Sequence, residues 1–230
     1  MSRPLAIDLF TGMHGWAEGL IAEGFRVVGF DIEDMCGQFG MPRPEHVQLV
    51  IQDVLTLHGS QFKDAALIVA SPPCQAYSYR AMPWKRAKAL PPPDNTLFEA
   101  CFRIQREACE AAGRHIPLIV ENVRGAQKWV GRARWNFGSF YLWGDVPALM
   151  PPPFRASKVP GFRFDGSGRS FQTASVGIKN GNDWFGAGDN CSLQRRHGSK
   201  SKSRKMASAM IAKIPLPLSR HIAVTFREAA

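Results

Sequence analysis

Between residues 66 and 78 the chain reads Ala66-Leu67-Ile68-Val69-Ala70-Ser71-Pro72-Pro73-Cys74-Gln75-Ala76-Tyr77-Ser78. The apolar residues at the start of this stretch predict a buried strand. Two prolines follow and stiffen the turn that carries Cys74, because proline fixes its own φ and biases the residue before it toward extended geometry. A free cysteine is usually a small buried hydrophobe. However, ligands bind at the carboxyl ends of strands in open α/β sheets, so core packing and a reactive thiol both stay open for Cys74.

Apolar runs typical of strands alternate with helix-like segments through the first part of the chain. The runs lie at residues 4–10, 25–30, 46–51, 66–70 and 116–120. Strands that alternate with helices imply a parallel sheet whose two faces are covered. Four of these runs end within a few residues of a carboxylate, and the remaining one leads into Cys74. We therefore expect polar and reactive groups to gather along one edge of the sheet.

Residues 96–112 form the clearest predicted helix. Asp94 and Asn95 offer an N-cap, Thr96 and Glu99 have the spacing of a capping box, and Gly113 is the expected C-cap. An apolar stripe at helical spacing predicts the buried face, which consists of Leu97, Cys101, Ile104, Ala108 and Ala112. The segment before this helix, residues 79–93, is basic and contains no acidic residue. Its length predicts a mobile basic loop beside Cys74.

The pattern weakens after residue 125. Residues 136–143 predict one more strand, and residues 154–193 are rich in glycine, serine and aromatic residues without a helical period. Residues 206–226 predict a helical segment that is interrupted at Pro215 and Pro217.

The charge balance favours a polyanionic partner. The chain has 29 Lys and Arg against 19 Asp and Glu, which gives a net charge of +10 and a pI near 9.7. A basic surface without a specific role is the alternative. The five cysteines are an odd number and include no Cys-x-x-Cys pair, so neither a disulfide framework nor a zinc site is indicated and a reducing compartment is expected. The sequence shows no export leader and no membrane-spanning run.

Residues 8–15 read Asp-Leu-Phe-Thr-Gly-Met-His-Gly and predict a loop from a strand to a helix. Glycine lets a ligand approach the backbone, and the N-terminus of the following helix favours electron-rich groups; a tight turn without a ligand explains the same residues. His14 interrupts the dinucleotide fingerprint, and without partner ligands at metal spacing it predicts a structural or hydrogen-bonding residue. Glu33 has the spacing from Gly12 of an acid that binds ribose hydroxyls, whereas Asp31 reads equally well as a solvated acid.

Glu121 and Asn122 follow the apolar run at residues 116–120. We expect that run to neighbour residues 66–70, so that the carboxyl group of Glu121 lies next to the turn of Cys74. A partly desolvated glutamate has a raised pKa and can hold a proton near neutral pH. A thiol nucleophile beside a proton donor is a pairing used in covalent catalysis.

Taken in order, these segments resemble the motifs of the cytosine carbon-5 DNA methyltransferase family. Residues 8–15 resemble its Asp-Leu-Phe-x-Gly-x-Gly-Gly cofactor loop, and Pro72 to Ser78 resembles its nucleophile motif Pro-Pro-Cys-Gln-x-Phe-Ser. Asp31-Ile32-Glu33 and Asp53-Val54 resemble its two further cofactor-contacting acids, and Glu121-Asn122-Val123 matches its Glu-Asn-Val. The resemblance covers residues 5–125 in the family's order.

The chain departs from the family's pattern at several positions. His14 stands where the family has a glycine, and Ala70-Ser71 stands where two glycines are usual. The late Gln-x-Arg-x-Arg motif has no clean counterpart, and the closing Gly-Asn-x-Val-Pro motif is only echoed at residues 211–215. Residues 151–205 leave a short segment for target recognition, and the compact size suggests a member from a mobile element or phage.

The resemblance implies an α/β fold, a Rossmann-like S-adenosylmethionine-dependent methyltransferase sheet with a small irregular target-recognition region. It divides the chain into a catalytic and cofactor-binding domain (1–150), a basic target-recognition region (151–205) and a C-terminal helical segment that returns to the catalytic domain (206–230). The activity it implies is transfer of a methyl group from S-adenosylmethionine to carbon 5 of a cytosine flipped out of double-stranded DNA. The expected protein is a monomer in the cytoplasm of a bacterial cell or a phage-infected host, with no membrane partner.

The resemblance also implies roles for individual residues. The catalytic residues would be Cys74 as nucleophile, Glu121 as proton donor, and Arg80, which would favour the thiolate. The expected cofactor-binding residues are Asp8, Phe10, Thr11, Gly12, His14, Gly15, Trp16, Asp31, Ile32, Glu33, Asp53, Val54 and Pro72. The residues expected to contact DNA or the target base are Ser71, Pro73, Gln75, Ser78, Asn122, Arg195, Arg196, Lys200 and Lys202. No metal is expected.

Two other functions stay open. The same nucleophile chemistry serves methylation of cytosine in RNA, or transfer of a different one-carbon group to cytosine. A catalytically inactive, basic DNA-binding relative would belong to another class, although the intact Cys74 and Glu121 argue against it.

Overall fold

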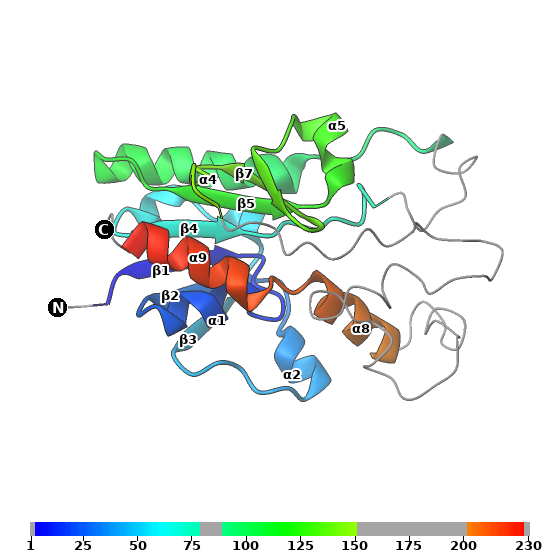
Figure 1. The fold of residues 1–230 in the computed structure, drawn as a ribbon, viewed down its shortest axis with the longest axis horizontal. Helices are drawn as coiled ribbons and strands as arrows, with labels where there is room; N and C mark the ends of the chain where they lie inside the picture. The colour runs from blue at the N-terminus through cyan, green and yellow to red at the C-terminus, as the bar shows by residue number, and fades with distance from the viewer. Residues whose placement is uncertain (1–2, 79–88, 151–201, 228–230) are drawn as a thin grey trace.

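The computed structural model describes residues 3–78, 89–150 and 202–227. They build an α/β fold around a seven-stranded sheet of order β3-β2-β1-β4-β5-β7-β6, with helices on both faces (Figure 1). The strands are β1 (Leu5–Leu9), β2 (Arg26–Asp31), β3 (Val47–Ile51), β4 (Leu67–Ala70), β5 (Leu118–Asn122), β6 (Trp135–Phe137) and β7 (Phe140–Gly144). The chain winds outward from the centre in both directions, so the Rossmann-like sheet has a topological switch point between β1 and β4, where open α/β sheets bind ligands.

The five strands predicted for the first part of the chain are present. β1 pairs in parallel with both β2 and β4, and β4 pairs in parallel with β5, as expected. β5 continues through Glu121 and Asn122, so these residues form the end of the strand instead of following it. The single strand predicted at residues 136–143 is wrong, because β6 and β7 form an antiparallel hairpin that turns at Gly138 with φ 60°.

One face of the sheet is covered by α4 (Thr96–Ala112) together with the short 3-10 helices η1 (Val54–Thr56) and η2 (Gly59–Phe62). The predicted apolar stripe of α4 faces the sheet, with its three central members buried and its two ends partly buried. Phe98 adds an edge-on ring contact with Trp143, with centroids 5.3 Å apart. The alternation of side chains along β1 and β4 sends Ile7 and Ile68 to this face.

The ends of α4 agree with the prediction, including Asn95 at the N-cap position, but the predicted capping box does not form. The helix starts at Thr96 and ends at Gly113, whose φ of 64° suits a glycine C-cap. The predicted capping box is wrong, because Thr96 lies within the helix and the carboxylate of Asp94 accepts from its N–H at 2.8 Å and its hydroxyl at 2.5 Å. Asp94, two residues before Thr96, therefore accepts the hydrogen bond from the N–H of Thr96 that Glu99 was expected to accept.

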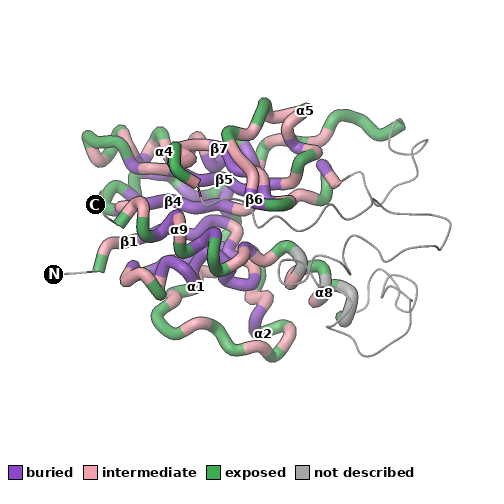
Figure 2. The backbone as a smooth tube through the Cα atoms, in the orientation of Figure 1, coloured by how far each residue is buried: buried purple, intermediate pink, exposed green. Residues whose placement is uncertain are grey.

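The opposite face is covered by α1 (Gly15–Ala22) and α9 (Leu216–Arg227), which pack on one another as well as on the sheet. Figure 2 shows the central strands β1, β4 and β5 and parts of these helices as buried. Gly19 lets the two helices approach closely, because a Cβ there would lie 2.5 Å from the backbone nitrogen of Arg220. The hydroxyl of Ser219 donates to the carbonyl of Trp16 at 2.5 Å across the same contact.

The helical segment predicted at residues 206–226 consists of two helices, α8 (Lys202–Ala212) and α9. The break falls at Lys213–Pro215. Pro217 does not interrupt α9, because it lies in the first turn, where the missing N–H has no partner to lose.

The remaining elements are α2 (Met35–Phe39), η4 (Arg124–Ala126) and α5 (Gln127–Val130). α2 and α8 lie toward the end of the molecule to which the parallel strands point (Figure 1). Most of the predicted target-recognition region, residues 151–201, lies outside the described residues. Among the helices that the structure describes, none is both long enough and apolar enough to cross a membrane.

Replacing Gly19 by alanine should destabilise the protein, which is the opposite of the usual effect of this change in a helix. The added methyl group meets the backbone of α9, and such overpacking costs about 1–3 kcal/mol. Ala22→Gly, at the exposed end of α1, is the control and should lose about 1 kcal/mol or less through helix propensity. Urea unfolding measures both variants. A Gly19→Ala protein as stable as the parent would contradict the close α1–α9 contact.

Candidate active site

The turn that carries Cys74 leaves the sheet at the carboxyl end of β4. Its first residue is still held by the sheet, because the N–H of Ser71 donates to the carbonyl of Leu9 at 3.1 Å. Pro72 is buried, Pro73 is exposed, and Cys74 is half-buried and belongs to neither core cluster. The N–H of Tyr77 and the hydroxyl of Ser78 both donate to the carbonyl of Cys74 at 3.0 Å. The thiol therefore belongs to a tight turn at the rim of the sheet and not to the core.

Glu121 and Asn122 end the neighbouring strand at the same edge. The register pairs Ala70 of β4 with Val120 of β5, so both chains leave the sheet side by side. The side-chain amide of Asn122, fully buried, donates to the carbonyl of Pro72 at 2.9 Å. Glu121 is 8% exposed. The structure thus ties the strand that carries the carboxyl group to the turn that carries the thiol.

The glycine-containing loop after β1 has an unusual backbone. Phe10, Gly12 and His14 all have positive φ, at 61°, 50° and 58°. Two contacts with β2 hold this conformation: the N–H of Thr11 donates to the carbonyl of Phe30 at 3.1 Å, and the N–H of Gly12 donates to the carboxylate of Asp31 at 2.9 Å. A Cβ at Gly12 would have only one neighbour, at 3.9 Å, so the outer side of the loop is open for a ligand.

Asp8, Thr11 and His14 form a buried polar unit beneath this loop. The hydroxyl of Thr11 donates to Asp8 at 2.7 Å and lies 3.2 Å from Nδ1 of His14. Burial raises the pKa of Asp8 to about 7 and lowers the pKa of His14, so burial favours the neutral form of each. Oδ1 of Asp8 and Nε2 of His14 have no hydrogen-bond partner among the described residues. The imidazole occupies the interior at a position where the backbone has a conformation typical of glycine.

The acids predicted to bind a cofactor lie at the carboxyl ends of β2 and β3. Asp31 is partly buried and accepts from the N–H groups of Gly12 and Ile32. Burial raises the pKa of Asp31. Glu33 is exposed and Asp53 caps η1 by accepting from the N–H of Leu55 at 2.9 Å. Val54, directly after Asp53, is buried in the core.

The residues at this edge fit the chemistry of S-adenosylmethionine. Exposed carboxylates can accept hydrogen bonds from ribose hydroxyls. Ile32 is 68% exposed and Ile51 is 55% exposed, which gives an apolar surface suited to a flat base. The open backbone at Gly12 is available to the polar end of such a ligand.

Trp16 and Ser71 connect the two loops at the switch point. Trp16 follows Gly15 in the first turn of α1, and its ring nitrogen donates to the hydroxyl of Ser71 at 3.0 Å. Both Gly15 and Trp16 are buried, and a Cβ at Gly15 would meet the backbone of Ile214 at 2.5 Å. These residues therefore join the glycine-containing loop to the cysteine turn from the inner side.

The remaining predicted site residues are less constrained. Gln75 and Lys202 are exposed, and Ser78 is half-buried. Arg80, Arg195, Arg196 and Lys200 lie outside the described residues. No three His, Cys, Asp or Glu side chains within the described ranges are placed to hold a metal ion.

The sequence interpretation missed residues that support the site. Asn95 accepts from the hydroxyl of Tyr77 at 2.8 Å, and Gly125 lies against the carbonyl of Tyr77. The only signal in the sequence was the tyrosine itself, which stands at the phenylalanine position of the nucleophile motif.

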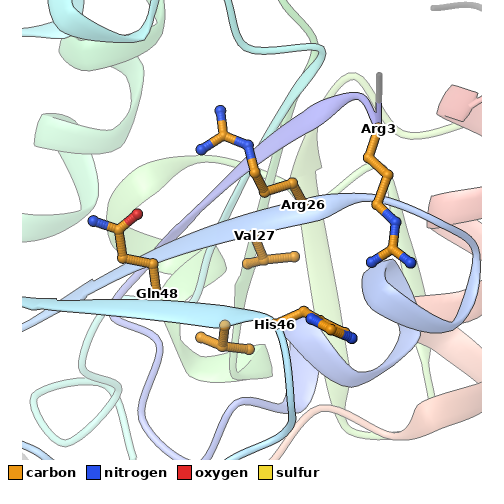
Figure 3. A pocket seen from close by; sticks show the side chains of 6 residues that line it. Arg3, Arg26, Val27, His46 and Gln48 are labelled. Atoms are coloured by element: carbon orange, nitrogen blue, oxygen red, sulfur yellow. The ribbon is translucent and has the colours of Figure 1, made fainter. Parts of the chain in front are cut away.

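A hollow of about 340 Å³ lies elsewhere, at the amino ends of β2 and β3. It is lined by Arg3, Arg26, Val27, His46, Val47 and Gln48 (Figure 3). The guanidinium groups of Arg3 and Arg26 point in different directions in this view. The hollow is at the edge of the sheet opposite to Cys74, and its cationic groups do not converge on one ligand position.

Asp8 should make the protein less stable as the pH rises. Its pKa is raised from 3.8 to about 7 in the fold, so the folded protein keeps a proton that the unfolded chain has lost, and the free energy of unfolding falls across this interval. Asp8→Asn should remove this fall, whose total is on the order of a few kcal/mol. The lowered pKa of His14 acts in the opposite direction below its usual 6.5, and it is common to both proteins.

Urea unfolding from about pH 4 to about pH 8 measures the effect, with Asp64→Asn as the exposed control. Parallel stability curves for the Asp8→Asn variant and the parent would contradict a proton held on Asp8.

Several solved structures are similar to part of the chain. A DNA modification methyltransferase encoded within an E. coli prophage is 23% identical, with a TM-score of 0.38 over 55% of this chain and 34% of that chain. The Dnmt2 methyltransferase of S. pombe is 18% identical, with a TM-score of 0.36 over 55% of this chain and 36% of that chain. The methyltransferase EhMeth of Entamoeba histolytica is 18% identical, with a TM-score of 0.36 over 56% of this chain and 40% of that chain.

The matched part thus spans well under half of the length of these structures. No curated protein matches the chain. The family model of the C-5 cytosine-specific DNA methylases matches residues 5–131, which is more than half of the sequence and contains β1 to β5 with the turn of Cys74 and Glu121. The chain therefore belongs to the C-5 cytosine-specific DNA methylase family.

Proposed function

We propose that this protein transfers a methyl group from S-adenosylmethionine to carbon 5 of cytosine in double-stranded DNA through a covalent adduct with Cys74. The observation that carries the proposal is the junction of β4 and β5. There a half-buried cysteine in a proline-stiffened turn is tied by Asn122 to the strand that ends in Glu121. The family membership supports the same chemistry.

The cofactor would lie across the carboxyl ends of β1, β2 and β3. Gly12 would offer its bare backbone, Glu33 and Asp53 would accept the hydroxyl protons of the ribose, and Ile32 would cover the base. The polar unit of Asp8, Thr11 and His14 would hold the loop in shape from below. When bound, S-adenosylmethionine supplies a methyl group attached to a positively charged sulfur atom.

Cys74 and Glu121 would divide the work on the cytosine ring. The Cys74 thiolate forms a bond to carbon 6, and Glu121 holds a proton at N3, so that the electron density entering the ring makes carbon 5 nucleophilic. Carbon 5 then accepts the methyl group. Transfer of the carbon-5 proton to solvent restores the ring double bond, and the bond between carbon 6 and sulfur breaks to release the thiolate of Cys74. Arg80, six residues after Cys74 in the sequence, would favour the thiolate.

The target cytosine would be flipped out of the duplex, which costs a few kcal/mol that contacts in the pocket offset. The net charge of +10 favours binding to the phosphates. Exposed Lys202 and Lys205 of α8 are candidate phosphate contacts in the described part of the chain. Residues 151–205 would supply target recognition, Arg195, Arg196 and Lys200 would add phosphate contacts, and the protein would act as a monomer.

Cys74→Ser should nearly abolish methyl transfer while leaving DNA binding largely intact, because a serine hydroxyl is a much weaker nucleophile than a thiolate. The measurement is incorporation of labelled methyl groups into duplex DNA, with formation of a stable adduct on 5-fluorocytosine DNA as a second readout. Cys109→Ser is the matched control, since Cys109 is also half-buried but bonds the backbone of Ile116 away from the rim.

Retained turnover in Cys74→Ser would refute the nucleophile. Labelling of tRNA instead of duplex DNA would redirect the proposal to RNA cytosine, and DNA binding by the parent without any adduct would indicate an inactive relative.

DNA affinity should fall steeply with salt. If about six basic side chains contact phosphates, the affinity drops by roughly three orders of magnitude between about 50 and about 200 mM salt. Replacing both Lys202 and Lys205 by serine should lower the slope of log affinity against log salt by about 2. Fluorescence anisotropy with a labelled duplex measures both, and a flat dependence would rule out the phosphate contacts.

A further inference from the structure

The cysteine turn has a second anchor besides Asn122, and it involves a group that the nucleophile motif of the family does not contain. Tyr77 stands where the motif has phenylalanine. Its side chain is buried, with 3% of the residue exposed. Its hydroxyl nevertheless finds a partner, because it donates to the side-chain oxygen of Asn95 at 2.8 Å.

Asn95 carries this link onward to a third segment. It is the residue directly before α4, and its side-chain amide donates to the carbonyl of Trp129 in α5 at 3.4 Å. α5 follows β5 along the chain, after η4. The two hydrogen bonds of Asn95 therefore join the cysteine turn, the start of α4 and the segment that follows Glu121.

Backbone packing at Gly125 strengthens the same connection. A Cβ at this position would overlap the carbonyl oxygen of Tyr77. Gly125 lies in η4, four residues after Glu121. The chain leaving β5 thus lies directly against the chain leaving β4, and any shift of Tyr77 would be transmitted to both.

The position of Tyr77 makes the link relevant to the thiol. The N–H of Tyr77 donates to the carbonyl of Cys74 at 3.0 Å, so the two residues are the ends of one tight turn. Tyr77 and Asn95 are 18 residues apart in the sequence, and Arg80 lies between them. Their hydrogen bond therefore joins the turn of Cys74 to the start of α4.

We propose that the hydroxyl of Tyr77, through Asn95, positions Cys74 for attack on the substrate ring. This inference rests on the proposed function. Tyr77 is a positioning residue in this account, because it acts through the turn and does not touch the substrate. The buried ring contributes to folding in any case, whereas the hydroxyl adds a directional restraint that phenylalanine lacks.

Tyr77→Phe is the test, because it removes the hydroxyl and keeps the ring. A neutral hydrogen bond of this kind is worth about a factor of 5 to 10. We expect the rate of adduct formation on 5-fluorocytosine DNA and kcat to fall by about that factor. KM for DNA and the Kd for S-adenosylhomocysteine should stay unchanged.

Two variants of Asn95 test the partner of the hydroxyl. Asn95→Asp keeps the acceptor oxygen, whereas Asn95→Ala removes it. The aspartate keeps an oxygen acceptor for the Tyr77 hydroxyl but loses the amide that donates to the carbonyl of Trp129, so it should retain more of the adduct rate than Asn95→Ala. Asn95→Ala should lose as much as Tyr77→Phe, and the double variant should lose no more than either single one. Tyr141→Phe is the control, since the Tyr141 hydroxyl bonds to none of the described residues.

An unchanged adduct rate in Tyr77→Phe, or a rise in KM alone, would overturn the positioning role. A second readout does not depend on methyl transfer: the pH profile of alkylation of Cys74 by iodoacetamide, followed by peptide mass mapping with Cys109 as internal reference. Identical Cys74 profiles in the parent and Tyr77→Phe would overturn the inference. If the parent forms no adduct but Tyr77→Phe alters the alkylation profile of Cys74, the proposed function is overturned and the positioning role is supported.

Discussion

The hydrogen bond from Asn122 to the carbonyl of Pro72 is the constraint on which the arrangement of the site depends. Pro72 and Pro73 have no backbone N–H, so neither residue can donate a hydrogen bond that holds the turn in place. A donor must come from another segment, and β5 supplies it because it lies beside β4 in register. The feature that stiffens the turn therefore also makes its position depend on the strand that ends in Glu121. Thiol and carboxyl group therefore share this contact, and the hydrogen bond between Tyr77 and Asn95 adds a second anchor for the turn.

The loop after β1 is open on its outer side, but it covers buried polar groups whose lack of partners among the described residues lowers the stability of the fold. Asp8 and His14 are fully buried and each has a polar atom without a partner in the described part of the chain. Leaving such atoms unpaired costs about 1–3 kcal/mol each. His14 also holds a positive φ that glycine would adopt without strain. The unpaired atoms and the positive φ therefore destabilise the fold directly beneath the backbone that faces the expected cofactor. Proteins commonly tolerate strain at ligand-binding sites.

Much of the fold follows from patterns that are local in sequence. Apolar runs ending in a carboxylate or a cysteine identify β1 to β5. The central strands β4 and β5 are buried on both faces, which explains why their apolar residues run without polar alternation. The hairpin of β6 and β7 was harder, because aromatic residues continue through the turn and only Gly138 marks it. The capping box of α4 was predicted wrongly because Asp94 and Glu99 are both possible hydrogen-bond acceptors for Thr96, and only geometry decides between them.

The site shows the same division. The position of Cys74 beside the strand of Glu121 follows from strand order, which the alternation of strands and helices predicts. The bond between Tyr77 and Asn95 could not be predicted, because it joins residues across a segment whose length does not determine where its ends meet. The conformation of His14 was equally inaccessible, since a positive φ at a non-glycine residue results from surrounding packing.

The packing of α9 on α1 has a consequence for synthesis of the protein. The contact between Ser219 and Trp16 joins residues 203 positions apart, and α1 begins directly after the loop that would receive the cofactor. At typical translation rates of about 5–20 residues per second, the inner face of α1 waits about 10–40 s for its partner. During that interval Trp16, Ala17 and Leu20 lack their final cover, so the nascent chain is exposed to aggregation and to chaperones. α1 therefore reaches its final packing only after α9 has left the ribosome.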